Sequence, residues 1–290
     1  MNERDWNLLK VLMEEKSITQ TAKRLFFSQP ALSARIRQIE KDFDCQIVIR
    51  DTKGITLTPE GELLGRYAQK ALLDLQQIKD RIDNVHTDIR GTLRIGCSNI
   101  YAKYKLPAIL KTFSELHPHV DIHLVTGLSQ RIYDYILSGQ IHLGIVRGDY
   151  SWVGERQLLA EDSYCVVSAR PINIAQLPSL PLIKHTTDKP LQGSLNSWWF
   201  SKFKEPPQVS MEVDGLDVCI QMVSHGLGYA LLSEMCAEGN SSLNFEKLKF
   251  ADGTALTRKT WALLHEETKQ NRLVNVFYEF LKSSSQIAEN

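Results

Sequence analysis

The chain has 290 residues, of which 43% are hydrophobic and 23% are charged. This composition excludes wholesale disorder, and the length suits two domains of about 100–200 residues each. The 34 basic residues balance the 34 acidic residues, so any attraction to nucleic acid or to an anionic membrane must come from local segregation of charge.

The N-terminal residues contain no export signal, and no apolar run approaches the ~18 residues that span a bilayer. The five cysteines, Cys45, Cys97, Cys165, Cys219 and Cys236, are scattered and include no CxxC pair. This usage is typical of reduced thiols rather than of a disulfide framework. We therefore expect a cytoplasmic protein that does not associate with membranes.

Helical periodicity dominates the start of the chain. Apolar residues recur at helical spacing over residues 6–13 and 18–25, and a third helix is predicted after Ser28, which can cap it, with Pro30 in its first turn. Its buried face is formed by Leu32, Ile36, Ile39 and Phe43. Two β-branched runs on either side of residues 50–54 then predict a hairpin with a basic tip. Three helices and a hairpin predict a winged helix-turn-helix over residues 1–58.

A long helix is predicted over residues 59–90, because Thr58 can cap it and Pro59 suits its first position. Its apolar residues are separated alternately by four and three positions, which is the heptad pattern of a coiled coil. They are Leu64, Ala68, Ala71, Leu75, Ile78, Ile82 and Val85. We interpret the first six as a dimerisation seam. Packing on the core of the same chain is the alternative, although such a helix would prefer a wider apolar stripe.

From residue 91 to residue 290 the pattern changes to alternating strands and helices. Strands are predicted at residues 91–99, 120–127, 141–148, 163–169, 180–185 and 207–214. Helices are predicted at residues 106–116, 129–138, 194–203 and 271–284, and residues 216–233 combine a helix, a glycine turn and a strand. This alternation predicts two α/β lobes. The first lobe would comprise residues 91–161 and 267–290, and the second residues 162–266.

The third helix also has a small, polar and cationic side. Helical geometry places Gln29, Ser33 and Arg37 along one flank, and the compact Pro30 would let the helix axis approach a partner closely. Gln, Ser and Arg side chains hydrogen-bond to base edges in the DNA major groove, which the second helix of a helix-turn-helix enters with its N-terminal residues. This flank therefore predicts DNA recognition.

Further residues suit contacts with phosphate. Arg35 lies on the other flank of the helix, Thr19 and Gln20 begin the preceding helix, and Lys53 lies at the hairpin tip. A cationic helix face can also be an ordinary solvated surface. Residues 16–39, however, contain five basic and no acidic residues. The hairpin and the adjoining seam also favour DNA binding, because a dimer can read a two-fold operator.

The run SITQTAKRLFFSQPALSARIRQIEKDFDCQIVIRDTKGITLTPEG, residues 17–61, resembles the N-terminal domain of LysR-type transcriptional regulators. That family combines an S-Q-P-A-L-S recognition helix, a wing and a T-x-x-G start to a linker helix. Here these are residues 28–33, residues 50–54, and Thr58 with Gly61. One departure is Phe26 and Phe27, which are bulkier than the usual residues before the serine.

The resemblance implies a winged helix-turn-helix, a linker helix and a two-lobed α/β effector domain of the type II periplasmic-binding-protein fold. It further implies a bacterial homodimer or homotetramer that binds double-stranded promoter DNA and RNA polymerase. A small-molecule effector would bind between the lobes as co-inducer. Neither enzymatic activity nor a cofactor is expected.

The resemblance places the effector at loops that follow strands, where open α/β sheets bind ligands. The matching positions are Ser98, Asn99, Gly127, Ser129, Arg147 and Thr186. Hydroxyl and amide groups supply hydrogen bonds, and an arginine suits an anion, so we expect a small organic anion. Two alternatives remain open: Ser98 and Ser129 as simple helix caps, and Arg147 as a surface salt-bridge partner.

Other features indicate neither metal binding nor catalysis. His117, His119 and His123 lack the cysteine or carboxylate partners of a zinc site, and the sequence has no Walker loop or GxSxG elbow. Trp198 and Trp199 predict core packing, and residues 226–230 predict a tight helix-to-strand turn rather than a dinucleotide site. An exported solute-binding protein would carry a signal, and an enzyme on this fold would need a catalytic cluster in the cleft.

Overall fold

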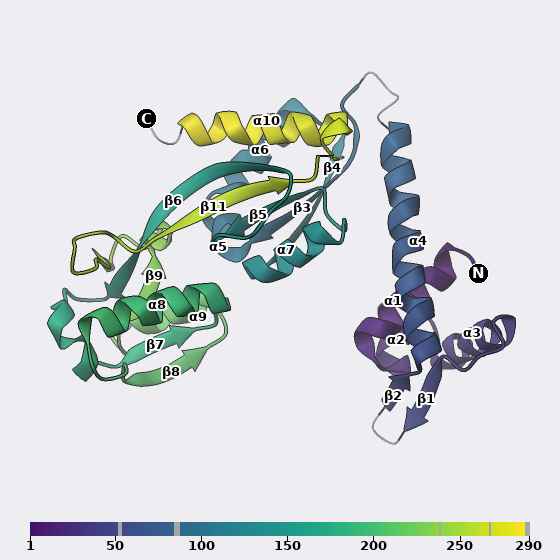
Figure 1. The fold of residues 1–290 in the computed structure, drawn as a ribbon, viewed down its shortest axis with the longest axis horizontal. Coiled ribbons are helices and arrows are strands. Elements are labelled where there is room, and N and C mark those ends of the chain that lie inside the picture. The colour runs from purple at the N-terminus through teal and green to yellow at the C-terminus, as the bar shows by residue number, and fades with distance from the viewer. Residues whose placement is uncertain (52–53, 84–87, 238, 267, 288–290) are drawn as a thin grey trace. The chain divides into compact units, whose positions relative to one another are not determined.

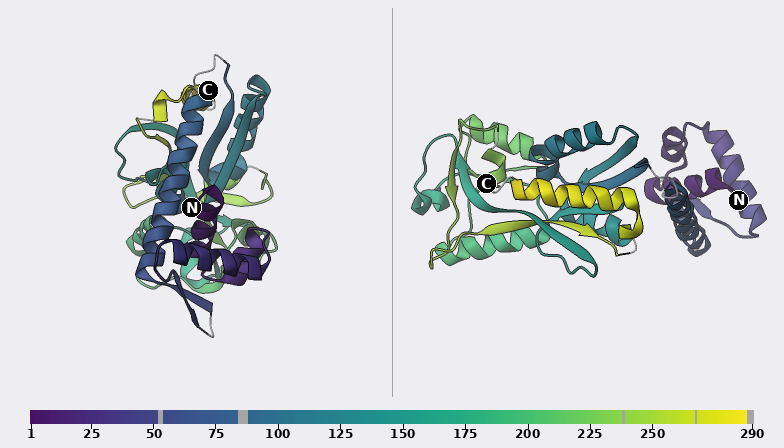
Figure 2. Two further views of the ribbon diagram at one scale, coloured as in Figure 1. Left: turned by 90° about the vertical axis from the view of Figure 1, so that its right-hand side faces the viewer. Right: turned by 90° about the horizontal axis from the view of Figure 1, so that it is seen from above.

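The computed structural model describes residues 1–51, 54–83, 88–237, 239–266 and 268–287. The chain divides into two compact units, Met1–Val85 and His86–Asn290, whose elements are labelled in Figure 1 and drawn from two further sides in Figure 2. Lys53, at the predicted hairpin tip, and Val85, at the end of the predicted heptad pattern, lie outside the described residues.

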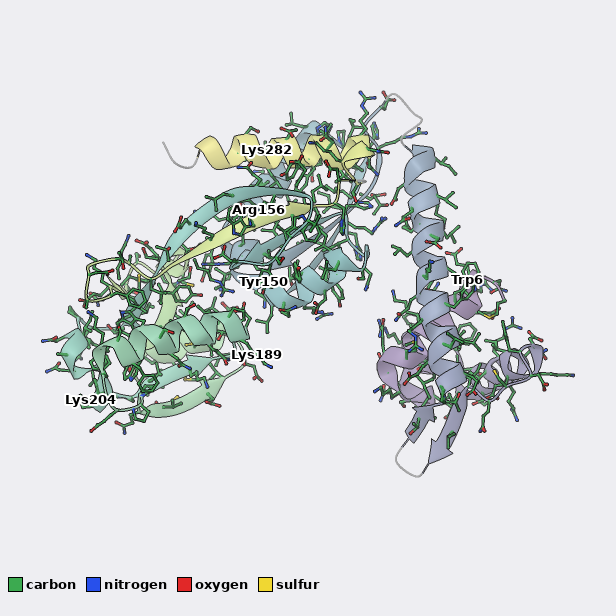
Figure 3. All side chains as sticks on the ribbon, viewed as in Figure 1. Trp6, Tyr150, Arg156, Lys189, Lys204 and Lys282 are labelled. Atoms are coloured by element: carbon green, nitrogen blue, oxygen red, sulfur yellow. The ribbon has the colours of Figure 1, made fainter. Side chains whose placement is uncertain are left out.

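The first unit is a winged helix-turn-helix followed by a long helix, as predicted. Its elements are α1 (Glu3–Glu15), α2 (Ile18–Arg24), α3 (Gln29–Asp42), β1 (Val48–Asp51), β2 (Gly54–Leu57) and α4 (Pro59–Asp83). The two strands pair antiparallel. Leu12, Leu32, Ile36 and Ile39 are fully buried in one core, and Trp6, labelled in Figure 3, packs against it. The buried face predicted for α3 is therefore confirmed at Leu32, Ile36 and Ile39, whereas Phe43 is 47% exposed.

The start of α4 explains the T-x-x-G pattern in physical terms. The Thr58 hydroxyl accepts the Gly61 N–H at 2.9 Å and donates to the carbonyl of Gln46 at 2.5 Å. A Cβ at position 61 would lie 2.2 Å from the backbone oxygen of Ile47. Threonine thus caps the helix, and glycine permits the helix to approach the strand so closely.

The second unit contains a mixed sheet with the strand order β10-β6-β11-β5-β3-β4, in which β9 also pairs with β6. The strands are β3 (Gly91–Ser98), β4 (Val120–Gly127), β5 (Leu143–Arg147), β6 (Glu155–Ser168), β9 (Ala230–Ser233), β10 (Asn244–Lys247) and β11 (Thr257–Leu264). Strand β3 lies between β4 and β5 and is parallel to both, as the alternating pattern predicts. β11 is antiparallel to both β5 and β6.

The helices of this unit belong to two lobes. The first lobe has α5 (Asn99–Tyr104), α6 (Leu106–Leu116), α7 (Ser129–Leu137) and α10 (Arg272–Ile287). The second has the parallel pair β7 (Leu182–His185) and β8 (Val209–Val213) with α8 (Lys189–Lys202) and α9 (Leu216–Ser224). Short 3₁₀ turns span Ile174–Ser179, Glu234–Ala237 and Thr268–Gln270. Phe113 and Phe277 meet edge to face in the first core, and Trp198 and Trp199 are buried in the second, as predicted.

Strands β6 and β11 connect the lobes. Residues 155–163 of β6 pair with β11, and residues 164–168 pair with β9 and β10 of the second lobe. β11 then returns the chain and pairs with β5 through residues 260–264. The chain therefore returns from the second lobe to the first before β11. The sequence had predicted that the second lobe ends at residue 266. The difference arises because residues 257–264 carried no predicted strand.

Candidate nucleic-acid interface and ligand cleft

Helix α3 presents small, polar and cationic side chains to solvent. Gln29, Pro30, Ala34 and Arg37 are exposed, whereas Ser33 is only 7% exposed. Residues 30, 34 and 37 follow one another at helical spacing, so the accessible strip is rotated relative to the predicted flank. Gln29, Pro30 and Arg37 are thus accessible to a partner, and Ser33 lies at the inner edge of the strip.

Serine side chains cap the starts of both α2 and α3. The Ser28 hydroxyl accepts the Ala31 N–H at the start of α3, and the Ser17 hydroxyl accepts the Gln20 N–H at the start of α2, both at 3.4 Å. Thr19 and Gln20 are exposed in the first turn of α2. They are therefore open to a phosphate group.

Arg35 is engaged within the protein. Its Nε and Nη2 atoms donate to the two carboxylate oxygens of Asp5 at 2.6 Å each, which holds α3 against α1. This hydrogen bonding is the main cause that lowers the pKa of Asp5 below its usual value. Arg37 forms no ion pair with any described residue. Arg37 is thus the available cation on the strip, and Arg35 is a positioning residue for α3.

The predicted seam of α4 has two parts. Leu64 packs against the core of the first unit, and Ala68 is fully buried in it. Ile78 and Ile82 are 55% and 58% exposed. Ala71 and Leu75, between the two parts, are half-buried. The first part of the seam is thus buried within the chain itself. The last turns of α4 leave apolar side chains exposed, where a second copy could pack.

A cleft of about 440 Å³ opens between the two lobes of the second unit. The six effector positions expected from the sequence all line it, namely Ser98, Asn99, Gly127, Ser129, Arg147 and Thr186. The cleft is also lined by five charged residues that were not predicted from the sequence, namely Lys103, Asp188, Asp214, Asp217 and Arg258. The strand-end rule could have found Asp214, because it directly follows β8. The volume is suitable for a small metabolite.

Three helices begin at this cleft with unused backbone donors. The N-cap residues of α5, α7 and α9 are Ser98, Leu128 and Gly215, and among the described residues none supplies a side-chain cap. The first N–H groups of a helix lack internal partners, and the helix dipole makes this end positive. Three such ends converge on the cleft, and each favours a negatively charged group nearby.

The two serines of the cleft differ in their roles. The Ser98 hydroxyl oxygen is buried, and it has no hydrogen-bond partner in the part of the chain that the structure describes. Helix capping therefore does not account for Ser98. The Ser129 hydroxyl accepts the backbone N–H of Arg147 at 3.0 Å, so it holds β5 beside the start of α7.

Arg147 is a buried connection between lobes rather than a surface salt-bridge partner. Its side chain is 2% exposed, and Nη2 lies 2.6 Å from an Asp162 carboxylate oxygen. Its Nη1 donates to the Ser233 hydroxyl at 3.1 Å. Nε has no hydrogen-bond partner among the described residues, so the guanidinium retains one donor.

The other cations of the cleft are also paired with acids. Arg258 Nη2 donates to Asp188 at 2.5 Å and to the carbonyl of Arg147 at 2.6 Å. Lys103 of α5 pairs with Asp217 of α9 and so joins the two lobes. The charged side chains therefore largely neutralise one another. Ser98 and Arg147 line the cleft, and the Ser98 hydroxyl and the Arg147 Nε are buried without a hydrogen-bond partner among the described residues.

Two features bear on metal binding and membrane association. Within the described ranges, no three His, Cys, Asp or Glu side chains come close enough together to hold a metal ion. In the same ranges no helix is both long enough and apolar enough to span a bilayer.

Comparison with known proteins agrees with both halves of this architecture. Residues 4–62 match the bacterial regulatory helix-turn-helix family of LysR type, and residues 86–286 match the LysR substrate binding domain. The chain is 39% identical over 287 residues to the uncharacterized HTH-type transcriptional regulator YraN of Bacillus subtilis (strain 168), with 99% of each chain covered.

Solved structures share the fold at 18% sequence identity. The full-length Vibrio cholerae virulence activator AphB matches with a TM-score of 0.64, covering 98% of this chain and 99% of that one. Full-length CbnR in complex with its target DNA matches with a TM-score of 0.69, covering 98% and 100%. The chain therefore belongs to the LysR family of DNA-binding transcriptional regulators.

Proposed function

We propose that this regulator is controlled by a small organic anion that binds in the cleft between the two lobes of the second unit. The observation that carries this proposal is the convergence of the starts of α5, α7 and α9 beside the buried, unpaired hydroxyl of Ser98. An anion accepts hydrogen bonds from all of these donors, and the helix dipoles favour its charge. Asn99, Gly127, Ser129, Arg147 and Thr186 complete the proposed site.

The proposed DNA contact runs along the exposed strip of α3. Gln29 and Arg37 would reach base edges in the major groove, and Pro30 would permit close approach. Thr19, Gln20 and Lys53 would hold phosphates. Ser33 and Arg35 would support the helix from its inner side.

Two copies would join through the exposed end of α4 and present two recognition helices to a promoter with two-fold symmetry. RNA polymerase is the proposed protein partner at that promoter, and the cytoplasm is the proposed compartment. The anion in the cleft would change how this assembly acts on transcription.

The anion site can be tested by thermal shift of the full-length protein against a panel of small mono- and dicarboxylates. A carboxylate that raises the melting temperature should bind Ser98→Ala about tenfold more weakly, because a charge-assisted hydrogen bond is lost. Ser114→Ala is the matched control, because this exposed serine of α6 lies outside the cleft. Equal binding to both variants, or a panel in which no carboxylate raises the melting temperature, would contradict the proposal.

DNA recognition can be tested by gel shift with DNA from upstream of the gene itself. We expect binding to an interrupted inverted repeat that weakens steeply with salt, since phosphate contacts release counterions. Gln29→Ala should reduce the preference for that DNA over an unrelated duplex. An unchanged preference together with a flat salt response would contradict the proposed interface.

A further inference from the structure

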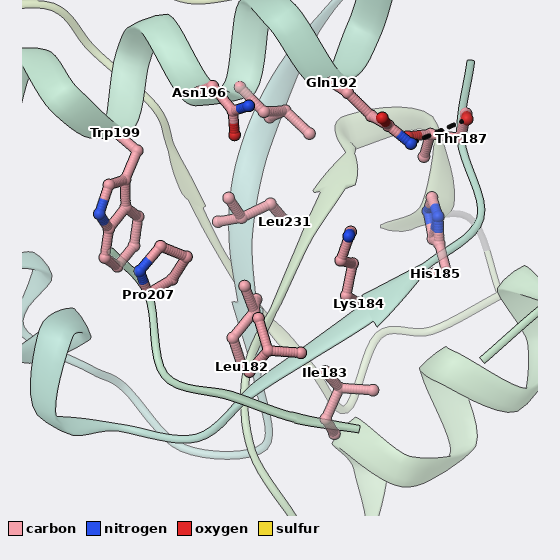
Figure 4. Close-up of a pocket in the computed structure, with 12 residues that line it drawn as sticks. Leu182, Ile183, Lys184, His185, Thr187, Gln192, Asn196, Trp199, Pro207 and Leu231 are labelled. Atoms are coloured by element: carbon pink, nitrogen blue, oxygen red, sulfur yellow. Dashed lines mark hydrogen bonds between the residues drawn. The ribbon is translucent and has the colours of Figure 1, made fainter. Parts of the chain in front are cut away.

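The second lobe contains a cavity of its own between α8 and the β7–β8 pair (Figure 4). Leu182 and Ile183 of β7 lie on one side, and Gln192, Asn196 and Trp199 of α8 lie on the other. Leu231, Val209, Leu195 and Pro207 complete most of the remaining wall. We call this space the lobe II cavity.

The lobe II cavity has the size and lining of a site for one ring. Its volume is about 170 Å³, and an apolar protein cavity of about 150 Å³ is known to hold benzene. Most of its lining side chains are aliphatic or aromatic, with Trp199 and Pro207 at the end away from His185. A molecule with a single six-membered ring therefore fits the space.

The charges around the lobe II cavity favour an uncharged occupant. Lys184 is the permanently charged side chain among its lining residues, and its Nζ lies 3.1 Å from a Glu212 carboxylate oxygen. Burial lowers the pKa of His185 below its usual value and so favours the neutral imidazole. An ionised ligand would lose hydration here without gaining an unpaired opposite charge.

Two polar side chains can orient such an occupant. The imidazole of His185 and the side-chain amide of Asn196 make no hydrogen bonds to the residues that the structure describes. Both can donate and accept hydrogen bonds. Each borders the apolar wall, so one hydroxyl or carbonyl group on the ring would find a partner.

The lobe II cavity adjoins the cleft but is partitioned from it. Gln192 Nε2 donates to the carbonyl of Thr187 at 3.2 Å, and His185 lies at the same end of the cavity (Figure 4). His185 and Thr187 line both spaces. A molecule in the cavity would therefore touch the wall of the cleft without entering it.

We propose that the lobe II cavity is a second ligand site, which binds an uncharged single-ring molecule that carries one hydrogen-bonding group. The proposal does not depend on the identity of the ligand in the cleft, because its own lining residues define it. In a regulator, such a site would allow a second ligand to act on the protein in addition to the ligand in the cleft.

Phenol is a suitable probe for this site in the full-length protein. Methyl NMR should show a saturable shift of Ile183, which lines the lobe II cavity, and no shift of Ile145, which is buried in the core of the first lobe. Benzoate carries the same ring with a charge, and it should bind at least about tenfold more weakly at neutral pH. Absence of a shift at Ile183, or a shift of Ile183 by benzoate at concentrations as low as those of phenol, would overturn the proposal.

Asn196→Phe places a ring at the exposed edge of the lobe II cavity and should weaken phenol binding at least about tenfold. Because Asn196 is exposed on α8, this change leaves the core intact. Ser197→Phe is the matched control, since it adds the same ring one residue away, at an exposed position outside the cavity lining. Equal phenol binding by both variants would also overturn the assignment.

Discussion

Arg35 of α3 donates two hydrogen bonds of 2.6 Å to the carboxylate of Asp5 in α1. The same carboxylate accepts the backbone N–H of Asn2 at 2.8 Å, while the Asn2 side chain accepts the Asp5 N–H at 3.1 Å. Asp5 is thus part of a capping box as well as an ion pair. A single side chain fixes the start of α1 and the orientation of α3.

Removing this contact should affect stability more than direct DNA readout. Arg35→Ala should destabilise the first unit by about 1–2 kcal/mol, less than a fully buried pair because the Arg35 side chain is 41% exposed. Arg37→Ala should leave stability unchanged and, as the loss of a base contact, weaken binding to the specific DNA by about 1–3 kcal/mol. Hydrogen exchange in α1 and α3, with gel shifts over a salt series, measures both effects. If Arg35→Ala weakened DNA binding with exchange unaltered, a direct phosphate contact would be the better explanation.

The ion pair also predicts a response to acid. The pKa of Asp5 is lowered in the folded state, chiefly by the hydrogen bond from Arg35, so its stabilisation is fully present above the ordinary value of about 3.9. It is lost as the pH falls through the folded pKa. Protection of α1 and α3 amides should therefore decline below about pH 4. Asp5→Asn should be less protected at pH 7, and its difference from the wild type should shrink in acid. A constant difference across this range would contradict the assignment.

Glycine at position 61 is required by contact rather than by backbone conformation. Gly61→Ala should destabilise the first unit by about 2–3 kcal/mol, because the added Cβ would meet the Ile47 carbonyl at 2.2 Å. Gly193→Ala is the opposite case: no atom lies within 4 Å of its Cβ position on α8, and the change should stabilise by about 0.5–1 kcal/mol. Chemical denaturation measures both. Similar effects of the two substitutions would be inconsistent with the close approach at Ile47.

The two parts of the α4 seam should respond differently to charge. Ile78→Lys should yield folded monomers by light scattering, since this exposed residue would face a second copy and a lysine there opposes pairing. Ala68→Lys should instead unfold the first unit, because Ala68 is completely buried within it. Retention of a dimer by Ile78→Lys would place the interface elsewhere.

Phe26, in the turn between α2 and α3, should be replaceable with a gain in stability. Its φ of 58° lies in the left-handed region, and its side chain is 97% exposed. The left-handed conformation costs an L-residue about 1–2 kcal/mol. Glycine relieves this cost, but its greater chain entropy in the unfolded state offsets part of the gain in stability. Phe26→Gly should therefore stabilise the protein by about 0.5–1 kcal/mol in chemical denaturation. A loss of stability would reveal a packing role for the ring.

Local patterns were sufficient to predict most of the architecture. The period of apolar residues identified α1 to α4, and the resemblance to the LysR family, which places the effector at strand ends, brought together residues as distant as Ser98 and Thr186. Antiparallel pairing at long range was not visible in the same way. Only residues 163–169 of β6 were recognised and β11 was missed, because residues 155–162 and 257–264 alternate only partly between buried and exposed positions.

Side-chain partners were the second limit of prediction. Arg35 suggests a phosphate contact until Asp5, thirty residues earlier in the chain, is seen beside it. Ser33 was assigned to the reading flank because the flank was drawn from residue spacing alone, and a shift of one residue turns a helical side chain by about 100°. The lobe II cavity is formed where α8 covers β7 and β8, so no local motif in the sequence predicts it.

Strand β6 has a mechanical consequence for signalling. It continues without a break from one lobe into the other, and its neighbour β11 has an irregularity in register between Thr260 and Trp261. Hydrogen-bonded strands resist sliding past each other but tolerate changes in twist. The lobes are thus connected by a continuous strand that can twist, rather than by flexible linkers. A ligand bound in the cleft would therefore change the relative orientation of the lobes by a rotation of small amplitude.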